Sequence, residues 1–417
     1  MSTHSGPEHV AIVGAGMVGL STAWFLQQRG VRTTIVDRSG VAAGASWGNA
    51  GLLTPAFTKP MPEPSVVRSG ITSLFDSSSP VTFARAGGRS LWPFLAGLAR
   101  HCTPIRWRRT MAVFNELNRI SLDAYDQLGD SGVVTSKRAD PFLAVCASGK
   151  DREDLVAELD AVRATGAEID YDLADGDELR ALEPTLSANV RTGVRVHGQR
   201  FIDPPESVRS LADAVRAAGD EIIEGFDVTD VRDLGAAGTE LVSSGGNTVR
   251  ADAAVLANGT WLGALARSFG VRRLVHPGRG YSFSVEPAAM PTHPIHLPAQ
   301  HVACNPLGEK FRVTGMMEFA AAGAPLDSRR VRTIIDAVRP MFTGVDWNAR
   351  YDEWVGSRPC TTDGLPLVGA TSSPRVHVAG GHGMWGMVLG PLTGRLVADS
   401  LVSRPVPQLM RHLDPLR

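Results

Sequence analysis

Three glycines and one aspartate near the N-terminus have the types and the spacing that hold a dinucleotide. Gly14 permits a tight turn, Gly16 lets the backbone approach a pyrophosphate, and Gly19 allows a helix to pack closely on a strand. Asp37 lies 18 residues after Gly19, where its carboxylate can accept a hydrogen bond from a ribose hydroxyl. This spacing predicts a dinucleotide site, and a strand–turn connection without a ligand is the alternative.

The elements that must position these residues are a strand, a helix and a second strand. Residues 10–13 form a short apolar run that is typical of a buried parallel strand. Residues 20–29 are compatible with a helix, and residues 33–36 with the second strand. Because a helix N-terminus offers free N–H groups to phosphates, Met17 and Val18 belong to the predicted binding turn.

The stretch 40–55, GVAAGASWGNAGLLTP, is small, glycine-rich and uncharged, so its backbone can run close beside a flat ligand. Ser46 and Asn49 supply hydrogen bonds that suit phosphate groups or ring edges. A flexible loop is the alternative, but Trp47 and Leu52 are residues of the buried type. The stretch therefore extends the predicted ligand site.

A second glycine-rich turn lies near the C-terminus. Residues 376–379 predict a buried strand, residues 380–386 a glycine turn and residues 392–401 a helix. This geometry can direct a helix N-terminus at an electron-rich ring. Two further segments, 251–261 and 354–369, each combine an apolar run with glycines.

These pieces, in this order, resemble the D-amino-acid oxidase/glycine oxidase superfamily, and most closely its bacterial FAD-dependent D-amino-acid dehydrogenases. The motifs that carry the resemblance are GASWGNAG, HPGRGYSFSV, GSRPCTTDGLPLVG and GGHGMWGM, and they span nearly the whole chain. The resemblance implies an α/β fold, with a Rossmann-type FAD-binding domain interleaved with an α+β substrate domain built on an antiparallel sheet. The expected ranges are 1–85, 195–275 and 340–417 for the FAD-binding domain, and 86–194 and 276–339 for the substrate domain.

The resemblance also implies which residues contact FAD. In addition to the turn described above, these are Asp37, Arg38, Ser46, Asn49, Ala50, Gly51, Val228, Gly259, Gly383, Met384, Gly386 and Met387. Relatives that hold flavin covalently use a cysteine in the context C-x-Y-T, whereas Cys360 lies in the context P-C-T-T-D. We therefore expect non-covalent FAD, with Cys360 as a small core residue.

Oxidation of an amino acid by flavin requires a cation for the substrate carboxylate, a neutral hydrogen-bonding group beside it and an apolar pocket. Arg358 is the candidate cation, since the matching arginine in glycine-oxidase relatives clamps the carboxylate and a guanidinium can bind it through two hydrogen bonds. Tyr281 is the candidate hydroxyl, and Arg279 on the same strand face is a second candidate cation. The alternatives are a structural salt bridge, a core tyrosine and a solvated cation.

Three other residues are candidates for contacts with the cofactor or the substrate. His382 belongs to the C-terminal glycine turn, where backbone contacts with the cofactor are the simpler interpretation and a catalytic base is the alternative. Met316 and Glu318 are candidates for the pocket wall. An acidic wall would favour basic or hydroxylated substrate side chains.

The predicted function is FAD-dependent oxidative deamination of a small amino acid, in the first instance a D-amino acid, by hydride transfer from Cα to flavin N5. Electrons would pass to a quinone or another carrier. The alternatives are an oxygen-reducing oxidase of glycine, sarcosine or an imino acid, an NAD-dependent dehydrogenase, and a flavin-bearing subunit of a hetero-oligomeric dehydrogenase.

Composition narrows the partners and the compartment. The formal net charge of −1 offers no general field for nucleic acid. The four cysteines lack the spacing of metal ligands, so no metal site is predicted and a reducing, cytoplasmic compartment is favoured. The segment 90–109 combines apolar and basic residues, so peripheral contact with the inner face of the membrane is an alternative to packing within the substrate domain.

Overall fold

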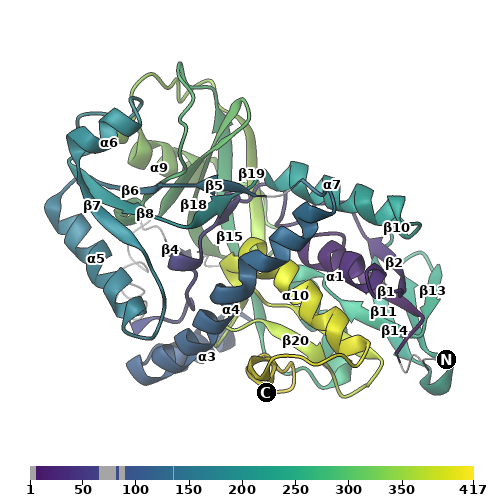
Figure 1. Cartoon of the computed structure of the whole chain (residues 1–417). Coiled ribbons are helices and arrows are strands. Elements are labelled where there is room, and N and C mark those ends of the chain that lie inside the picture. Colours follow the sequence, from purple (N-terminus) through teal and green to yellow (C-terminus); the bar gives the residue numbers. More distant parts are fainter. Residues whose placement is uncertain (1–5, 65–80, 84–89, 135) are drawn as a thin grey trace.

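A six-stranded sheet forms the first layer of the fold. The computed structural model describes residues 6–64, 81–83, 90–134 and 136–417 (Figure 1). The sheet has the order β10-β2-β1-β14-β21-β20, and β20 alone is antiparallel to its neighbour. Its strands are β1 (His9–Val13), β2 (Arg32–Asp37), β10 (Glu221–Glu224), β14 (Ala253–Leu256), β20 (Leu367–Ala370) and β21 (Val376–Gly380).

Both faces of this sheet are covered, which explains why its central strands β1, β14 and β21 are almost entirely buried. Val10 and Ile12 of β1 belong to the apolar cluster formed with α1 (Met17–Gln27), α7 (Pro204–Ala217) and α10 (Gly386–Leu401). The alternate residues Ala11 and Val13 pack toward the other face. That face is covered by α8 (Leu262–Ala266) and by a small antiparallel sheet of β11 (Val228–Asp233), β12 (Thr239–Ser243) and β13 (Thr248–Ala251).

A nine-stranded sheet forms the second lobe (Figure 1). Its order is β19-β15-β18-β17-β16-β6-β8-β7, with β4 paired to β18. Neighbours are antiparallel except for β16 with β6 and β18 with β4. The strands are β4 (Val81–Phe83), β6 (Phe142–Cys146), β7 (Tyr171–Asp175), β8 (Thr192–Val196), β15 (Val275–Val285), β16 (Ile295–Leu297), β17 (Val302–Leu307), β18 (Lys310–Phe319) and β19 (Tyr351–Thr361).

The remaining elements surround these two sheets. A three-stranded sheet joins β3 (Leu52–Leu53), β9 (Gln199–Phe201) and β5 (Lys137–Ala139). The other helices are α3 (Leu91–His101), α4 (Pro104–Asp130), α5 (Gly149–Arg163), α6 (Gly176–Leu182) and α9 (Ser328–Val338). The long helix α4 packs on α10, and the Tyr125 hydroxyl donates a hydrogen bond of 2.6 Å to the carbonyl of Met387.

The predicted fold class is confirmed, with a Rossmann-type sheet and a mostly antiparallel second sheet contributed by alternating stretches of the chain. Two strands lie in the second sheet although the predicted ranges assign them to the FAD-binding domain. These are β4, within 1–85, and β19, within 340–417. The reason is that β19 pairs with β15 along nearly its whole length, which local sequence does not reveal. The predicted boundary between 85 and 86 lies outside the described residues.

The contact between α1 and α10 depends on a glycine. A Cβ atom on Gly394 would lie 2.6 Å from the backbone of Ser21 and Thr22 in α1. We expect Gly394→Ala to push the two helices apart and to lower the free energy of unfolding by about 1–3 kcal/mol, measured by urea denaturation. Gly263→Ala in α8 is the matched control, since a Cβ there meets nothing within 4 Å and no loss is expected. Equal stability of the two variants would contradict the packing argument.

Candidate functional site

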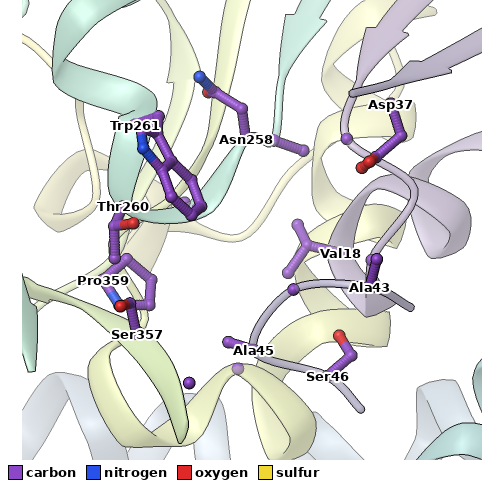
Figure 2. A pocket seen from close by; sticks show the side chains of 18 of the residues that line it. Val18, Asp37, Ala43, Ala45, Ser46, Asn258, Thr260, Trp261, Ser357 and Pro359 are labelled. Carbon is purple, nitrogen blue, oxygen red and sulfur yellow. The ribbon is translucent and has the colours of Figure 1, made fainter. Parts of the chain in front are cut away.

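A cavity of about 510 Å³ lies where the parallel sheet meets the edge strand β19 (Figure 2). It extends from the carboxyl ends of β1, β2, β14 and β21 to the wall formed by residues 354–359. The carboxyl end of a parallel sheet is where ligands of doubly wound folds bind. Most of the predicted cofactor residues line it, namely Gly14, Gly16, Met17, Val18, Asp37, Arg38, Ser46, Asn49, Val228, Gly259, Gly383, Met384, Gly386 and Met387.

The N-terminal glycine turn brings free backbone donors to this cavity. Helix α1 begins at Met17, and its N-cap Gly16 supplies no side-chain cap. The following loop contacts the turn at Ser46, whose Oγ accepts a 3.3 Å hydrogen bond from the Met17 N–H, and at Ala42, whose N–H donates a 3.0 Å hydrogen bond to the carbonyl of Ala15. Gly14 has φ +115°, and a Cβ there would lie 2.5 Å from the Ala257 carbonyl oxygen. The uncapped helix end therefore presents N–H groups and a positive dipole to an anionic ligand.

The Asp37 carboxylate is fixed by the backbone around it. Oδ2 accepts a hydrogen bond of 2.9 Å from the Ala15 N–H. Oδ1 accepts hydrogen bonds from the N–H groups of Ser39 and Gly40, at 2.8 and 3.0 Å. A carboxylate has about four acceptor sites, so one remains for a ligand hydroxyl. The geometry fits the ribose contact predicted from the sequence.

The opposite side of the cavity carries buried polar groups without a partner among the described residues. Asn258 Oδ1 and Thr260 Oγ1 form no hydrogen bond within this part of the chain. Figure 2 shows both residues with Trp261 across the cavity from Asp37. The guanidinium of Arg38 lies 3.3 Å from the centroid of the Trp261 ring, so a cation–π contact joins the two sides. Because buried polar atoms are rarely unpaired, these orphaned acceptors fit a polar ligand such as FAD.

The C-terminal glycine turn brings a second helix N-terminus to the cavity. Gly383 has φ +56°, and α10 begins at Gly386. Burial lowers the pKa of His382 to about 4, so its ring is neutral at physiological pH. Its Nε2 shares a 2.8 Å hydrogen bond with Thr393 Oγ1 on the far side of the turn. The side chain is thus held within the protein, although His382 also lines the cavity.

Arg358 lies on the β19 wall of the cavity. Its Nη1 donates a hydrogen bond of 2.9 Å to the carbonyl of Met316, and burial lowers its pKa. Within the described residues it forms no ion pair with a carboxylate. A Cβ on Gly280 would collide with the guanidinium, so this glycine leaves the space in which the guanidinium lies. A Cβ on Gly356 would likewise collide with the ring of Trp354.

Arg279 and Tyr281, predicted to bind the substrate, do not line the cavity. Successive residues of a strand point to opposite faces, and these two lie on the face of β15 that packs toward α9. Tyr281 is fully buried and donates a 2.6 Å hydrogen bond to Glu318, which also forms an ion pair with Arg279. Glu318 and Met316, the two candidates for the pocket wall, are likewise absent from the lining.

Three predicted cofactor residues also lie outside the lining, and each has a structural partner. A Cβ on Gly19 would collide with the Gly14 carbonyl, and a Cβ on Gly51 with the Ile202 carbonyl. The carbonyl of Ala50 accepts a hydrogen bond of 2.8 Å from Asn305. These positions shape the backbone that surrounds the cavity.

Sequence reasoning missed part of the lining. The missed residues include Asn258, Thr260, Trp261, Thr314, Ala322, Trp354 and Ser357. Asn258, Thr260 and Trp261 directly follow β14, so the rule that ligands bind at the carboxyl ends of parallel strands could have found them. Thr314 of β18 and Ala322 of the loop after it could not have been found in this way, because their positions depend on the pairing of β18 with the distant strand β15.

Cys360 is separated from the main cavity. It is buried, its thiol pKa is raised to about 12 by burial, and it lines only a neighbouring space of about 10 Å³. Within the described part of the chain, no group of three His, Cys, Asp or Glu side chains could hold a metal ion. No helix among the described residues is long and apolar enough to cross a membrane.

Comparison with known proteins defines the class. Residues 9–400 match the DAO family, described as FAD dependent oxidoreductase. The chain belongs to this family, and it is an FAD-dependent oxidoreductase.

The relatives match nearly the whole length of this chain, and the solved structures share its fold. The chain is 28% identical to a D-amino acid dehydrogenase of Cereibacter sphaeroides over 403 residues, covering 95% of this chain and 92% of the relative. It is 29% identical to a D-amino acid dehydrogenase of Xanthobacter autotrophicus over 404 residues, covering 95% of each. Glycine oxidase from Bacillus cereus has the same fold, with a TM-score of 0.75, 21% identity and coverage of 97% of both chains. The FAD-bound L-alpha-glycerophosphate oxidase of Mycoplasma pneumoniae gives a TM-score of 0.71 at 17% identity, covering 96% of this chain and 97% of that one.

The cofactor site can be tested at Gly16, where a Cβ would meet only Ser46 Oγ, at 3.3 Å. We expect Gly16→Val to fold but to purify without yellow colour, because the added methyl groups occupy the space beside the helix N-terminus. The measurement is the ratio of flavin absorbance to protein absorbance. Gly149→Val is the matched control at the exposed start of α5, where a Cβ meets nothing within 4 Å. A fully flavin-loaded Gly16→Val protein would contradict the assignment of this turn.

Proposed function

We propose that the protein catalyses the oxidative deamination of a small amino acid, in the first instance a D-amino acid. The observation that carries the proposal is Arg358, a buried guanidinium that lines the cavity and forms no ion pair with a described carboxylate. FAD supplies the acceptor for the hydride that leaves the substrate Cα. Relatives across the whole chain that bear the name D-amino acid dehydrogenase support this substrate class.

The guanidinium of Arg358 has the geometry needed to bind a carboxylate. One nitrogen is used by the Met316 carbonyl, which leaves donors on the planar guanidinium for an incoming carboxylate. A buried cation without a counter-ion is costly, and an anionic ligand removes that cost. We therefore assign to Arg358 the binding and orientation of the substrate carboxylate.

The proposed reaction needs no protein base. Apart from Arg358, the ionisable side chains that line the cavity within the described residues are Asp37, Arg38, Asp227 and His382. Three of these lie on the dinucleotide side of the cavity, near the ends of β2 and β10, and the neutral His382 is bonded to Thr393. The amine would therefore be reactive in its neutral form, and positioning would make the main contribution to catalysis.

We also propose that FAD is held without a covalent bond, since the Cys360 thiol is buried outside the main cavity and its pKa is raised. The proposed electron acceptor is a quinone or another carrier. An oxygen-reducing oxidase of glycine, sarcosine or an imino acid is the alternative, and so is a flavin-bearing subunit of a hetero-oligomer.

The proposed location is the cytoplasm, with peripheral contact at the inner face of the membrane. Trp92 of α3 is 70% exposed and Ile105 of α4 is 66% exposed. Arg106, Arg108 and Arg109 are exposed beside them. Exposed apolar side chains flanked by cations suit an anionic lipid interface, which supports delivery of electrons to a membrane-bound quinone.

The function is tested by anaerobic reduction of the flavin with D- and L-amino acids, glycine, sarcosine and D-proline. We expect a D-amino acid to bleach the flavin fastest, with a rate that rises with pH along the single ionisation of the substrate amine. A quinone analogue should then reoxidise the enzyme faster than dissolved oxygen does. Reduction by sarcosine or glycine alone, followed by rapid reoxidation in air, would favour the oxidase alternative.

The role of Arg358 is tested by two substitutions. Arg358→Lys keeps the charge but loses the planar pair of donors. We expect transition-state stabilisation to fall by about 1.5–3 kcal/mol, so that kcat/KM falls on the order of ten- to a hundredfold. Arg358→Ala should lose more, while flavin content stays normal. Arg332→Ala is the control, because this arginine is exposed on α9. Unchanged turnover in Arg358→Ala would remove the observation on which the proposed substrate class rests.

A further inference from the structure

Three polar side chains are buried together behind the cavity wall, on the α9 side of the sheet. Glu318 Oε2 lies 3.0 Å from Arg279 Nη1 and accepts a 2.6 Å hydrogen bond from the Tyr281 hydroxyl. The other carboxylate oxygen lies 3.6 Å from Arg330 Nε. Burial is nearly complete, since the side chains of Arg279 and Glu318 are 4% and 9% exposed. The carboxylate is thus fixed between two guanidinium groups and a phenol.

Arg279 connects this cluster to a loop. Its Nη2 donates hydrogen bonds of 2.7 Å to the carbonyl of Ala324 and 2.8 Å to that of Pro325. Glu318 holds the other branch of the same guanidinium. Because the guanidinium is planar, fixing one branch also fixes the direction of the other. The ion pair with Glu318 therefore determines where the two loop carbonyls lie.

The loop, residues 320–325, forms part of the cavity wall. Ala322 lines the cavity, and its carbonyl accepts a 3.3 Å hydrogen bond from Ser357 Oγ, one residue before Arg358. The loop has the sequence AAAGAP, so it offers no large side chain that could anchor it by apolar packing. Its position must come from hydrogen bonds, and the buried guanidinium provides two of them.

One irregularity in strand pairing sets the positions of Arg279 and Arg358. The pairing of β15 with β18 shifts register between Arg279 and Tyr281, and Met316 in the shifted segment has φ +63°. The shift turns the Met316 carbonyl toward Arg358 Nη1 on the cavity face. It also leaves Glu318 opposite Arg279 on the other face. A change in the buried cluster is therefore transmitted to the wall beside the proposed carboxylate ligand.

We propose that Arg279, Tyr281 and Glu318 are positioning residues that hold the loop 320–325 in place as the cavity wall beside Arg358. The inference deepens the proposed function and rests on it only in taking this wall as the substrate side of the cavity. The cluster acts through the loop and makes no contact with the substrate. This role replaces substrate binding, which the sequence predicted for Arg279 and Tyr281.

The position of the loop can be tested without turnover, in the FAD-loaded protein. Ala322→Cys introduces a thiol into the half-buried wall, and all four native cysteines are buried, so an aqueous thiol reagent reports the new site. Arg279→Met with Glu318→Gln removes both charges of the closest ion pair together, so neither of these two partners is left buried without the other. We expect labelling of Cys at 322 to accelerate on the order of tenfold or more in this background, since two charge-assisted hydrogen bonds to the loop are lost.

The matched control is Arg332→Met, which removes an exposed arginine from α9 and should leave the labelling rate unchanged. Arg279→Lys is the second variant. It keeps the charge but cannot direct two branches, so an intermediate rate is expected. Flavin content and circular dichroism verify that each protein is folded. Equal labelling in the Arg279→Met/Glu318→Gln and Arg332→Met proteins would overturn the proposal.

A kinetic measurement separates this inference from the proposed function. With any substrate that bleaches the flavin, the double variant should raise KM on the order of tenfold while flavin content stays normal. If no amino acid reduces the flavin, the proposed function fails, but the labelling rates still test the loop. An unchanged KM together with accelerated labelling would show that the loop does not border the substrate, and would overturn the positioning role.

Discussion

The alternation of side chains along β15 is the constraint on which the site depends. One face of this strand lies against Arg358 and Cys360 of β19, and the other packs on the core beneath α9. Gly278, Gly280 and Ser282 occupy the first face, and the glycines leave room for side chains that reach across from neighbouring strands. Phe283 and its alternate neighbours occupy the second face. A shift of one residue would turn Arg279 and Tyr281 toward Arg358, so the register fixes both the packing of the core and the surroundings of Arg358.

Local sequence could predict the dinucleotide site because its parts are contiguous. The strand, the turn and the helix of residues 9–27 are set by glycine geometry and by a helix end, and both are readable without knowledge of distant contacts. The helix predicted over 392–401 is also present, although it begins earlier, at Gly386. Its first six residues include Gly386, Gly390 and Pro391, which a propensity argument disfavours, and burial against α1 outweighs that propensity.

The substrate side could be predicted only in part. A family resemblance predicted Arg358 as the carboxylate-binding residue. The side of β15 on which Tyr281 lies could not be predicted, because it depends on which face α9 covers. The same limit applies to β19, whose pairing with β15 joins residues about 80 positions apart. Contacts of this kind are not encoded in spacing or periodicity within one segment. The difference between the predicted ligand set and the cavity lining therefore comes from tertiary pairing.

The order of the strands has a consequence for biosynthesis. The sheet that borders the cofactor site takes its strands from residues 9–37, 221–256 and 367–380, and α10 follows at 386–401. During translation, the first turn emerges long before β21 and α10, which complete the far wall of the site. An emerging chain thus carries an exposed apolar strand edge and an incomplete cavity until residues 376–401 have been made. The cavity that would hold the flavin is therefore complete only after these residues have been synthesised.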